Sequence, residues 1–227
     1  MAKLTFHGHS TFSIETDDGV NLVIDPFFTD NPSFEGSVDD VEADFVLVTH
    51  GHYDHVADLI PLAERTGATV IAAYEIAQYL ETRGITASPQ HIGGGVQYPF
   101  GYVKMTAALH GGMVQLPGAE PFSTLPAGLL INLNGGQRFH HAGDTGLLTD
   151  MQLLNGKVDV AVLPIGDRFT MGPEDAATAV DFIGPRVVIP CHYDTWPPIE
   201  QDADAFKQAV GDRAEVEIMK AGDIYEF

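Results

Sequence analysis

The ten residues Val46–His55, VLVTHGHYDH, constrain the chain more than any other stretch. The run Phe45–Thr49 is apolar and largely β-branched, a pattern typical of a strand that is buried on both faces. A loop at the end of such a strand is held by the scaffold and still reaches solvent, as a reactive site requires. Directly after this run, within six residues, come four side chains that can bind a metal: His50, His52, Asp54 and His55.

This cluster has the spacing of a site for two metal ions. His50 and His52 are two residues apart, so their side chains point to the same side of an extended segment. Asp54 and His55 follow where the chain turns toward a helix, so they can face a neighbouring point. Neutral imidazole and carboxylate are ligands of zinc and of other first-row divalent ions. A histidine-rich surface loop that binds nothing is the alternative, and the position after a buried strand disfavours it.

Three more side chains of these types stand at the ends of apolar runs farther along the chain. They are His110, which precedes two glycines, Asp144 and His192. One such residue alone could equally well have a structural, hydrogen-bonded role. Because all three end a predicted strand, as the first cluster does, we expect them to complete the metal site. The runs that they follow are Tyr102–Leu109, Arg138–Ala142 and Val187–Pro190.

Both halves of the chain show the same order of elements: short antiparallel strands, then alternating strands and helices. The turn signals Asp17–Gly19 and Asn134–Gly136 each mark a hairpin. We therefore predict an α/β fold in which two sheets pack together with helices outside. We expect one domain, 1–227, built from two similar halves, roughly 1–100 and 101–227. Further strands are expected at Leu4–Phe6, Thr11–Glu15, Leu22–Ile24, Thr69–Ala73, Leu129–Asn134, Val158–Leu163, Val216–Met219 and Ile224–Phe227, and helices at Val56–Thr66, Tyr74–Arg83, Pro173–Phe182 and Ala203–Val210.

The charge balance bears on partners and location. The 227 residues include 32 acidic and 11 basic side chains, which gives a formal net charge of −21. A surface this acidic repels phosphate backbones, so we expect no nucleic-acid partner. The sequence has neither an apolar run of roughly eighteen residues nor a signal-peptide pattern, and its single cysteine, Cys191, excludes an internal disulfide. We expect a cytoplasmic protein that binds no membrane.

The segment Thr49–His55, followed in order by His110, Asp144 and His192, resembles the metallo-β-lactamase superfamily over essentially the whole chain. The resemblance implies the αββα four-layer sandwich of that superfamily, in which two mixed sheets pack face to face. It also implies which ligands bind each metal ion. One ion would be bound by His50, His52 and His110, the second by Asp54, His55 and His192, and Asp144 would bridge the two.

Four shorter segments resemble one branch of this superfamily, the lactonase-like, uncharacterised metal-dependent hydrolases related to L-ascorbate-6-phosphate lactonase. The best-known β-lactamases have cysteine at the position of Asp144, whereas here Cys191 adjoins a candidate ligand and replaces none. Hydrolysis of a β-lactam is therefore not the expected natural task. The four segments are Gly8–Phe12, Ile24–Pro26, Leu163–Gly166 and Met171–Ala176.

The implied cofactor is a pair of divalent ions, zinc ahead of manganese, iron or nickel. Such ions lower the pKa of a bridging water to roughly 7 and supply hydroxide at neutral pH. Asp54 can accept a hydrogen bond from that water and take its proton, so we expect it to be the catalytic base. The expected enzyme is a dinuclear metal-dependent hydrolase that acts on a small ester, lactone or phosphodiester-like molecule.

Four further residues are candidates for contacts with the ligands or the substrate. His9 could support a ligand or touch the substrate, or be a hydrogen-bonded structural residue. Asp25 ends a strand and could hold a ligand histidine through its free ring nitrogen, or cap a turn. Arg168 could bind an anionic substrate group or pair with a nearby acid. Tyr193, directly after His192, could line the pocket.

Two other functions remain open. The same scaffold supports redox chemistry at a di-iron site, which would need a separate electron donor, because the chain has no room for a flavin domain. A non-catalytic, metal-stabilised binding module is the second alternative, but a structural site is normally closed to further ligands. Seven candidate ligands for two ions leave room for water, which favours catalysis. The expected partner is a small-molecule substrate, and a homo-oligomer is possible.

Overall fold

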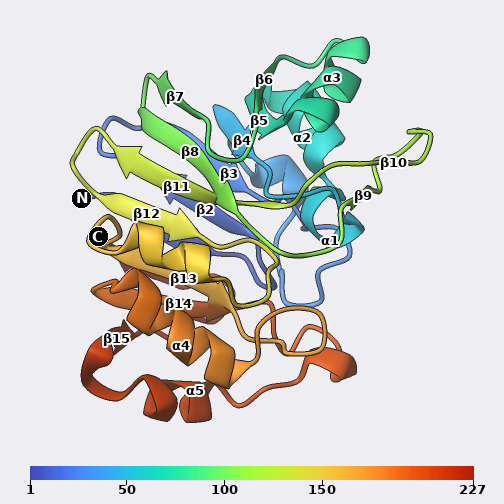
Figure 1. Cartoon of the computed structure of the whole chain (residues 1–227). Coiled ribbons are helices and arrows are strands. Elements are labelled where there is room, and N and C mark those ends of the chain that lie inside the picture. The colour runs from blue at the N-terminus through green and yellow to red at the C-terminus, as the bar shows by residue number, and fades with distance from the viewer.

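The computed structural model describes all residues, 1–227, and contains two seven-stranded sheets packed face to face (Figure 1). Each sheet is mixed, because antiparallel pairs on one side give way to parallel pairs on the other. Helices cover both outer faces. The predicted α/β architecture, an αββα sandwich of two mixed sheets, is confirmed. No helix has both the length and the apolar character needed to cross a bilayer.

The strands of the first sheet follow the order β16-β1-β2-β3-β4-β5-β6, and those of the second follow β15-β14-β13-β12-β11-β8-β7. Strands β9 and β10 form a separate pair. The strands are β1 Lys3–Phe6, β2 Phe12–Glu15, β3 Asn21–Ile24, β4 Phe45–Leu47, β5 Thr69–Ala73, β6 Ala87–Gln90, β7 Gly95–Tyr98, β8 Gly101–Ala107, β9 Met113–Val114, β10 Phe122–Ser123, β11 Ala127–Leu133, β12 Arg138–His141, β13 Val160–Pro164, β14 Val187–Cys191, β15 Glu215–Val216 and β16 Ile224–Glu226.

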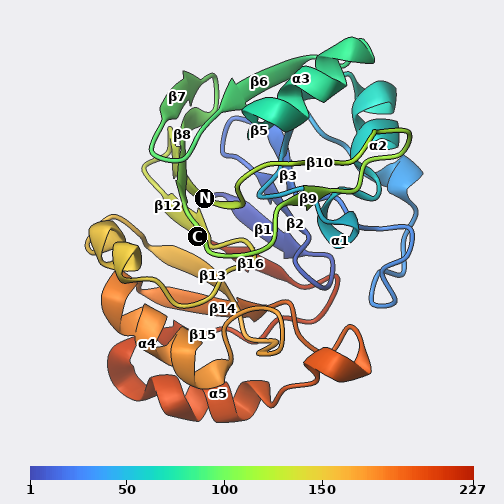
Figure 2. The same ribbon diagram turned by 45° about the vertical axis from the view of Figure 1, so that its right-hand side comes forward.

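Helices α2 and α3 lie beyond the first sheet, and α4 and α5 lie beyond the second (Figure 2). The N-terminus of α4 has Pro173 in its first turn, and its C-terminus ends at Gly184 with a left-handed φ of 62°. Helix α5 is capped by Asp202, whose side chain accepts two backbone N–H groups. The helices are α1 Tyr53–Val56, α2 Leu59–Thr66, α3 Tyr74–Thr82, α4 Pro173–Ile183 and α5 Ala203–Val210, with short 3-10 segments η1 Val38–Asp40, η2 Thr149–Leu154, η3 Pro197–Ile199 and η4 Gly211–Arg213.

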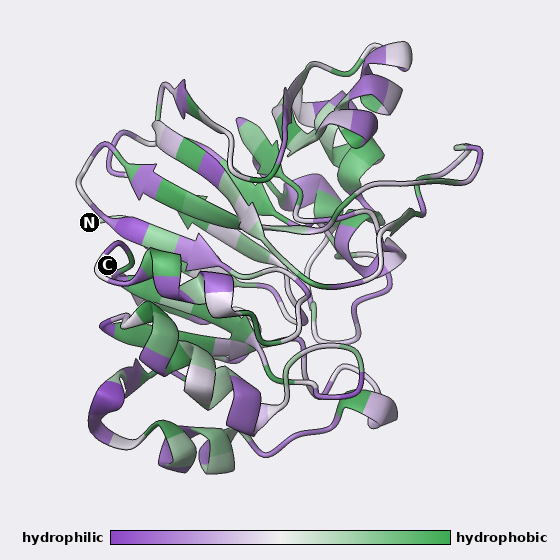
Figure 3. Ribbon diagram, viewed as in Figure 1, coloured by the Kyte–Doolittle hydropathy of each residue, from purple (hydrophilic) through white to green (hydrophobic).

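The apolar residues divide between three layers because side chains alternate along each strand. In β3, Leu22 and Ile24 face the other sheet, whereas Val23 faces the helices. A cluster of 24 buried residues fills the space between the sheets. Two clusters of 18 buried residues each lie under the helices. Figure 3 shows α4 and α5 with both hydrophobic and hydrophilic residues, as expected of helices that bury one side.

Strand direction brings five loops to one end of the molecule. Strands β3 and β4 run parallel, and β1 runs the same way because both β1 and β3 are antiparallel to β2. In the second sheet, β12, β13 and β14 are parallel, and β8 shares their direction through β11. The loops after β1, β4, β8, β12 and β14 therefore leave at matching edges, and they contain the candidate ligands.

Several predicted elements end elsewhere than expected. The predicted helix Val56–Thr66 is two helices, because Asp58 is tied by its carboxylate to the backbone N–H groups of Phe28 and Thr29. The predicted strand Tyr102–Leu109 ends at Ala107. The predicted strand Val216–Met219 is reduced to β15, because Met219 turns into the core between the sheets. Strands β6, β7, β9 and β10 were not predicted.

The two halves exchange strands at their boundaries. Strand β7 lies before residue 101 but pairs with β8 of the second sheet. Strand β16, at the end of the chain, returns to the first sheet and pairs with β1. The division into halves near residues 100 and 101 therefore describes the order of elements along the chain better than it describes the membership of the sheets.

Candidate metal centre

A first group of four side chains comes from the loops after β4, β8 and β12. Its ligand-type atoms all lie within 4.8 Å of one another. Nδ1 of His52 lies 3.0 Å from Nε2 of His50 and 3.2 Å from Nε2 of His110. Oδ2 of Asp144 lies 3.4 Å from Nε2 of His110. The chain thus brings together the three histidines predicted for one metal ion and the predicted bridging carboxylate.

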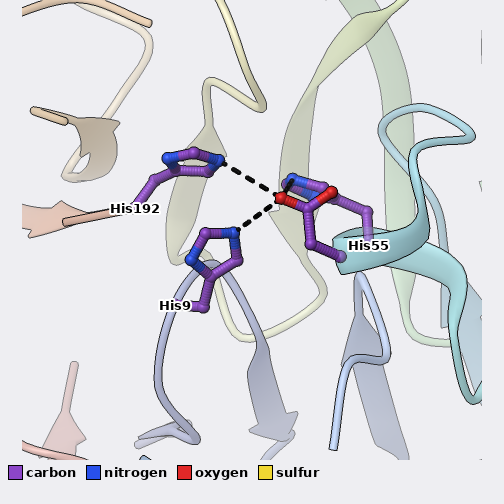
Figure 4. A group of neighbouring side chains, drawn as sticks. His9, His55 and His192 are labelled. Atoms are coloured by element: carbon purple, nitrogen blue, oxygen red, sulfur yellow. Dashed lines mark hydrogen bonds and ion pairs between the residues drawn. The ribbon is translucent and has the colours of Figure 1, made fainter. Parts of the chain in front are cut away.

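A second group lies beside the first and joins the start of α1 to the loops after β1 and β14. Within it, Oδ2 of Asp54 lies 3.7 Å from Nε2 of His192 and 4.0 Å from Nε2 of His55. His9 also belongs to this group, because its Nε2 lies 3.1 Å from the same oxygen. His9 and His192 both approach Oδ2 of Asp54, and Figure 4 shows the two rings directed at one carboxylate oxygen near His55.

Asp144 faces both groups. Its Oδ1 lies 3.4 Å from Nε2 of His55, and its Oδ2 lies 3.0 Å from Nε2 of His192. The same Oδ2 lies 3.8 Å from Nε2 of His50, in the other group. This carboxylate therefore occupies the position between two sites that a shared ligand would need.

A hydrogen-bond chain behind the centre fixes the ring nitrogens of two histidines. Asp25 accepts the backbone N–H of Thr49 at 2.8 Å and its hydroxyl at 2.6 Å. Nδ1 of His55 lies 2.8 Å from the same carboxylate, which can only accept, so this nitrogen donates. The Thr49 hydroxyl, having donated to Asp25, accepts from Nδ1 of His50 at 3.0 Å. In the neutral form of both imidazoles, Nε2 therefore carries the lone pair and faces the centre.

Unpaired polar atoms at this centre fit a bound cation. Buried polar atoms in folded proteins normally have hydrogen-bond partners. Here Nε2 of His55, Nε2 of His192 and Oδ1 of Asp144 are buried and form no hydrogen bond of normal geometry, although both nitrogens lie within 3.4 Å of the Asp144 carboxylate. Imidazole lone pairs and carboxylate oxygens are the donor set of first-row divalent ions. The residues present therefore fit the metal that the fold family implies.

Electrostatics at the centre favour positive charge between the carboxylates. Burial alone would lower the pKa of His192, but Asp144 and Asp54 raise it to about 9. Burial would raise the pKa of Asp144, yet His192 and His55 hold it well below its usual range. The pKa of His55 is likewise raised against the effect of burial, by Asp144, Asp25 and Asp54. A divalent ion is the natural occupant of such a field.

The backbone is unusual where it presents these groups. His9, Asp25 and His192 have φ values of 56°, 49° and 55°, in the left-handed region that residues other than glycine seldom adopt. Such conformations persist where the surrounding structure imposes them, and they concentrate at functional sites. Gly111 allows a close approach, because a Cβ there would lie 3.2 Å from the His52 ring.

The four other candidates are placed differently. Asp25 lies behind His55, and His9 lies inside the second group, where its Nδ1 contacts Oγ1 of Thr195 at 2.7 Å. Arg168 is exposed, forms no ion pair and lies over the ring of Phe169. Tyr193 points away from the centre, because it packs against the apolar cluster under α4 and α5. The expectation that Tyr193 lines the pocket therefore does not match its position.

Thr49 and His141 hold the loops of the centre, and of the two the sequence failed to indicate only the role of Thr49. Thr49 connects Asp25 to His50. His141 accepts the backbone N–H of Gly143 at its Nδ1, so its Nε2 donates to the carbonyl of Ser10 at 3.2 Å. The alternation of side chains along β12, which predicts that one of His140 and His141 faces the core, places His141 on the same side as the core residue Phe139.

The fold and this centre define a class, the metal-dependent hydrolases of the β-lactamase superfamily. The family model described as "Beta-lactamase superfamily domain" matches residues 20–193. A UPF0173 metal-dependent hydrolase of Heliobacterium modesticaldum is 45% identical over 233 residues, which cover 98% of this chain and 96% of that one. Another, from a Geobacillus species, is 48% identical over 207 residues, 90% of this chain and 91% of its own. The chain belongs to the UPF0173 metal-dependent hydrolases of this superfamily.

A solved structure agrees with this assignment. Igni18, a metallo hydrolase from the hyperthermophilic archaeon Ignicoccus hospitalis, matches with a TM-score of 0.89 and 35% sequence identity. The match covers 100% of this chain and 99% of Igni18. The predicted superfamily is confirmed, whereas the relation to L-ascorbate-6-phosphate lactonase stays a prediction.

Proposed function

We propose that the protein holds two divalent metal ions, zinc ahead of manganese, iron or nickel, and hydrolyses a small ester, lactone or phosphodiester-like molecule. The observation that carries the proposal is the position of Asp144, whose two oxygens face two adjacent groups of ligand-type atoms. The homologues named metal-dependent hydrolases support the reaction class. We assign one ion to His50, His52 and His110, the second to Asp54, His55 and His192, and the bridge to Asp144.

Bound divalent ions supply Lewis acidity and bring the pKa of water to roughly 7. The chain's own contribution is to hold the ligands in place. Asp25 accepts from His55 directly and reaches His50 through Thr49, so one buried carboxylate orients an imidazole in each group. Such outer contacts fix the ring orientation and make the ligand nitrogen more basic.

Asp54 is the residue to which we assign proton transfer. Its side chain is 25% exposed, against 3% for Asp144, so it lies at the mouth of the centre. Burial would raise the pKa of Asp54, but His55, His192 and His9 hold it well below its usual range. At neutral pH it is thus a carboxylate, which can accept a hydrogen bond from the attacking water; the proton transfer that we assign to it follows from this position and not from its pKa. His9, 3.1 Å away, fixes the orientation of the acceptor oxygen.

The test compares the wild type with Asp54→Ala. Each protein is reconstituted with zinc, its metal content is measured, and hydrolysis is followed for lactones, phosphodiesters, thioesters and β-lactams. We expect the wild type to bind about two ions per chain. Turnover should fall by at least about 100-fold in Asp54→Ala, as is usual when a general base is removed. Asp150→Ala, an exposed aspartate on η2, is the matched control and should keep full activity.

The two alternatives predict different outcomes of the same experiment. Iron in the purified protein together with oxygen reduction would favour the di-iron redox function. Full metal occupancy with no turnover of any substrate class would favour a metal-stabilised binding module.

A further inference from the structure

Three aromatic rings form a row beside the second ligand group. The ring centroids of Trp196 and Phe27 are 6.1 Å apart, and those of Phe27 and Tyr53 are 6.2 Å apart. We call this row, Trp196–Phe27–Tyr53, the aromatic wall. It adjoins the centre through His9, whose ring centroid lies 4.9 Å from that of Trp196 and 5.6 Å from that of Phe27.

The wall is built to present aromatic surface. Phe27 is 1% exposed and anchors the row, whereas Tyr53 and Trp196 are 42% and 38% exposed. The three rings come from different segments: the loop after β3, the first turn of α1 and the loop after β14. Tyr53 is further held by a hydrogen bond from its hydroxyl to Asp30. Aromatic rings that lie half in water beside a ligand group offer a flat apolar contact to a bound molecule.

The other side of the centre is also apolar. Leu109 precedes His110 and is exposed, and so is Phe169, whose backbone lies beside the His110 ring. The exposed apolar side chains therefore flank both ligand groups. Arg168, the residue before Phe169, is an exposed cation. It lies over the Phe169 ring and forms no ion pair. The surroundings thus offer a substrate flat apolar contacts more than ionic ones.

We propose that the substrate carries a planar apolar group, such as an aromatic ring, next to the bond that is cleaved, and that this group packs on the aromatic wall. The inference rests on the proposed function for the cleavage step, but binding of the ring needs only the wall. A substrate is the occupant favoured here because the wall is continuous with the ligand group through His9. A second copy of the chain is the rival occupant.

Binding can be tested without turnover, because Trp196 is the only tryptophan. Its fluorescence is titrated with benzylacetone, a ketone that cannot be hydrolysed, and with butanone, which lacks the ring. Titrations use the protein as purified and again after treatment with a chelator. We expect the fluorescence to change saturably with benzylacetone and not with butanone. The affinity for benzylacetone should be about three- to tenfold weaker in Tyr53→Ala, which corresponds to the loss of one aromatic contact. Tyr74→Ala, which removes another half-exposed tyrosine on α3, should bind as the wild type does.

A kinetic comparison then tests whether the wall acts on substrates. In the zinc-loaded protein, kcat/KM for phenyl acetate relative to methyl acetate should fall about three- to tenfold in Trp196→Ala and recover in Trp196→Phe. Leu153→Ala, at an exposed position on η2, should leave the ratio unchanged. Ring binding without hydrolysis of any ester, lactone or phosphodiester would reject the proposed function and keep the wall as a binding site.

Three results would overturn the inference itself. The first is an equal response to benzylacetone and butanone, and the second is an equal loss of affinity in Tyr53→Ala and Tyr74→Ala. The third is Trp196 emission that depends on protein concentration together with a dimer on size exclusion, which would make the wall an interface between two copies.

Discussion

Nδ1 of His55 lies 2.8 Å from Oδ2 of Asp25, and neither side chain is exposed to solvent. The same carboxylate oxygen accepts the hydroxyl of Thr49, which in turn faces Nδ1 of His50. One buried aspartate behind the centre therefore orients a histidine in each ligand group. An isolated buried carboxylate would be costly, so its three hydrogen bonds are part of what keeps this arrangement folded.

Asp25→Asn should weaken metal binding by about 10- to 100-fold, the usual effect of losing such an outer partner. The neutral amide is a poorer acceptor for His55, and its NH2 group would face a donor. Affinity is measured by competition with a chromogenic chelator. Asp44→Asn is the control, because Asp44 also accepts a backbone N–H but lies at the start of β4, on the surface. Equal affinities for both variants would contradict the role given to Asp25.

Gly111→Ala should displace the ring of His52 and lower occupancy of the first ligand group several-fold. A Cβ at Gly111 would come within 3.2 Å of Cε1 of His52, closer than side chains normally pack. Gly146→Ala is the matched control, since its nearest neighbour, the Leu109 carbonyl, would be 4.0 Å away. The metal content of the two variants is measured after dialysis against a limiting amount of chelator, and it should be lower in Gly111→Ala. Full occupancy in Gly111→Ala would show that this close approach is not needed.

His9→Gln should affect the second ligand group and spare the first. Its Nε2 contacts Asp54 and its Nδ1 contacts Thr195, so its removal leaves the Asp54 carboxylate free to rotate. We expect one of the two steps of a zinc titration to weaken several-fold while the other is unchanged, read by calorimetry. His7→Gln, which removes a histidine bonded to Ser13 instead, should alter neither step.

His140 should make stability depend on pH. Burial lowers the pKa of His140 to about 3, whereas in the unfolded chain it titrates near its ordinary value of about 6.5. The unfolded state alone therefore takes up this proton as the pH falls below about 6.5, so the contribution to stability is present above that pH and is lost toward pH 3. From about pH 7.5 to pH 5 the loss is about 2 kcal/mol.

Urea unfolding of the wild type and of His140→Gln across this range measures the difference. The free energy of unfolding of the variant should fall less steeply with acid. His91→Gln, at an exposed turn, should follow the wild type. Parallel curves for wild type and His140→Gln would contradict the burial argument.

The strands that sequence predicted best are those buried on both faces. Strand β5 spans Thr69–Ala73 as expected, because a short apolar β-branched run has few alternatives. Strand β6, Ala87–Gln90, was missed because it is an edge strand with Pro89 and polar neighbours, and its pairing with β5 decides its conformation. The break between α1 and α2 depends on Asp58 bonding to residues 28 and 29, which no local pattern reveals.

Some of the candidate site, too, could be predicted from local sequence and some could not. The spacing of His50 and His52 indicated one part of the site, and the position of the distant histidines and aspartate at the ends of predicted strands indicated the rest of the ligands. The contact of His9 with Thr195 joins residues 186 positions apart, so local patterns could not give it. The left-handed backbone of His192 sends its ring to the centre while Tyr193 packs under the helices, and a sequence does not show such a turn.

The most direct test of the central claim is anomalous diffraction from crystals of the zinc-loaded protein. We expect about two zinc peaks per chain a few ångströms apart, one among His50, His52 and His110 and the other among Asp54, His55 and His192, with Asp144 reaching both. A single peak, or zinc bound only at surface carboxylates, would contradict it.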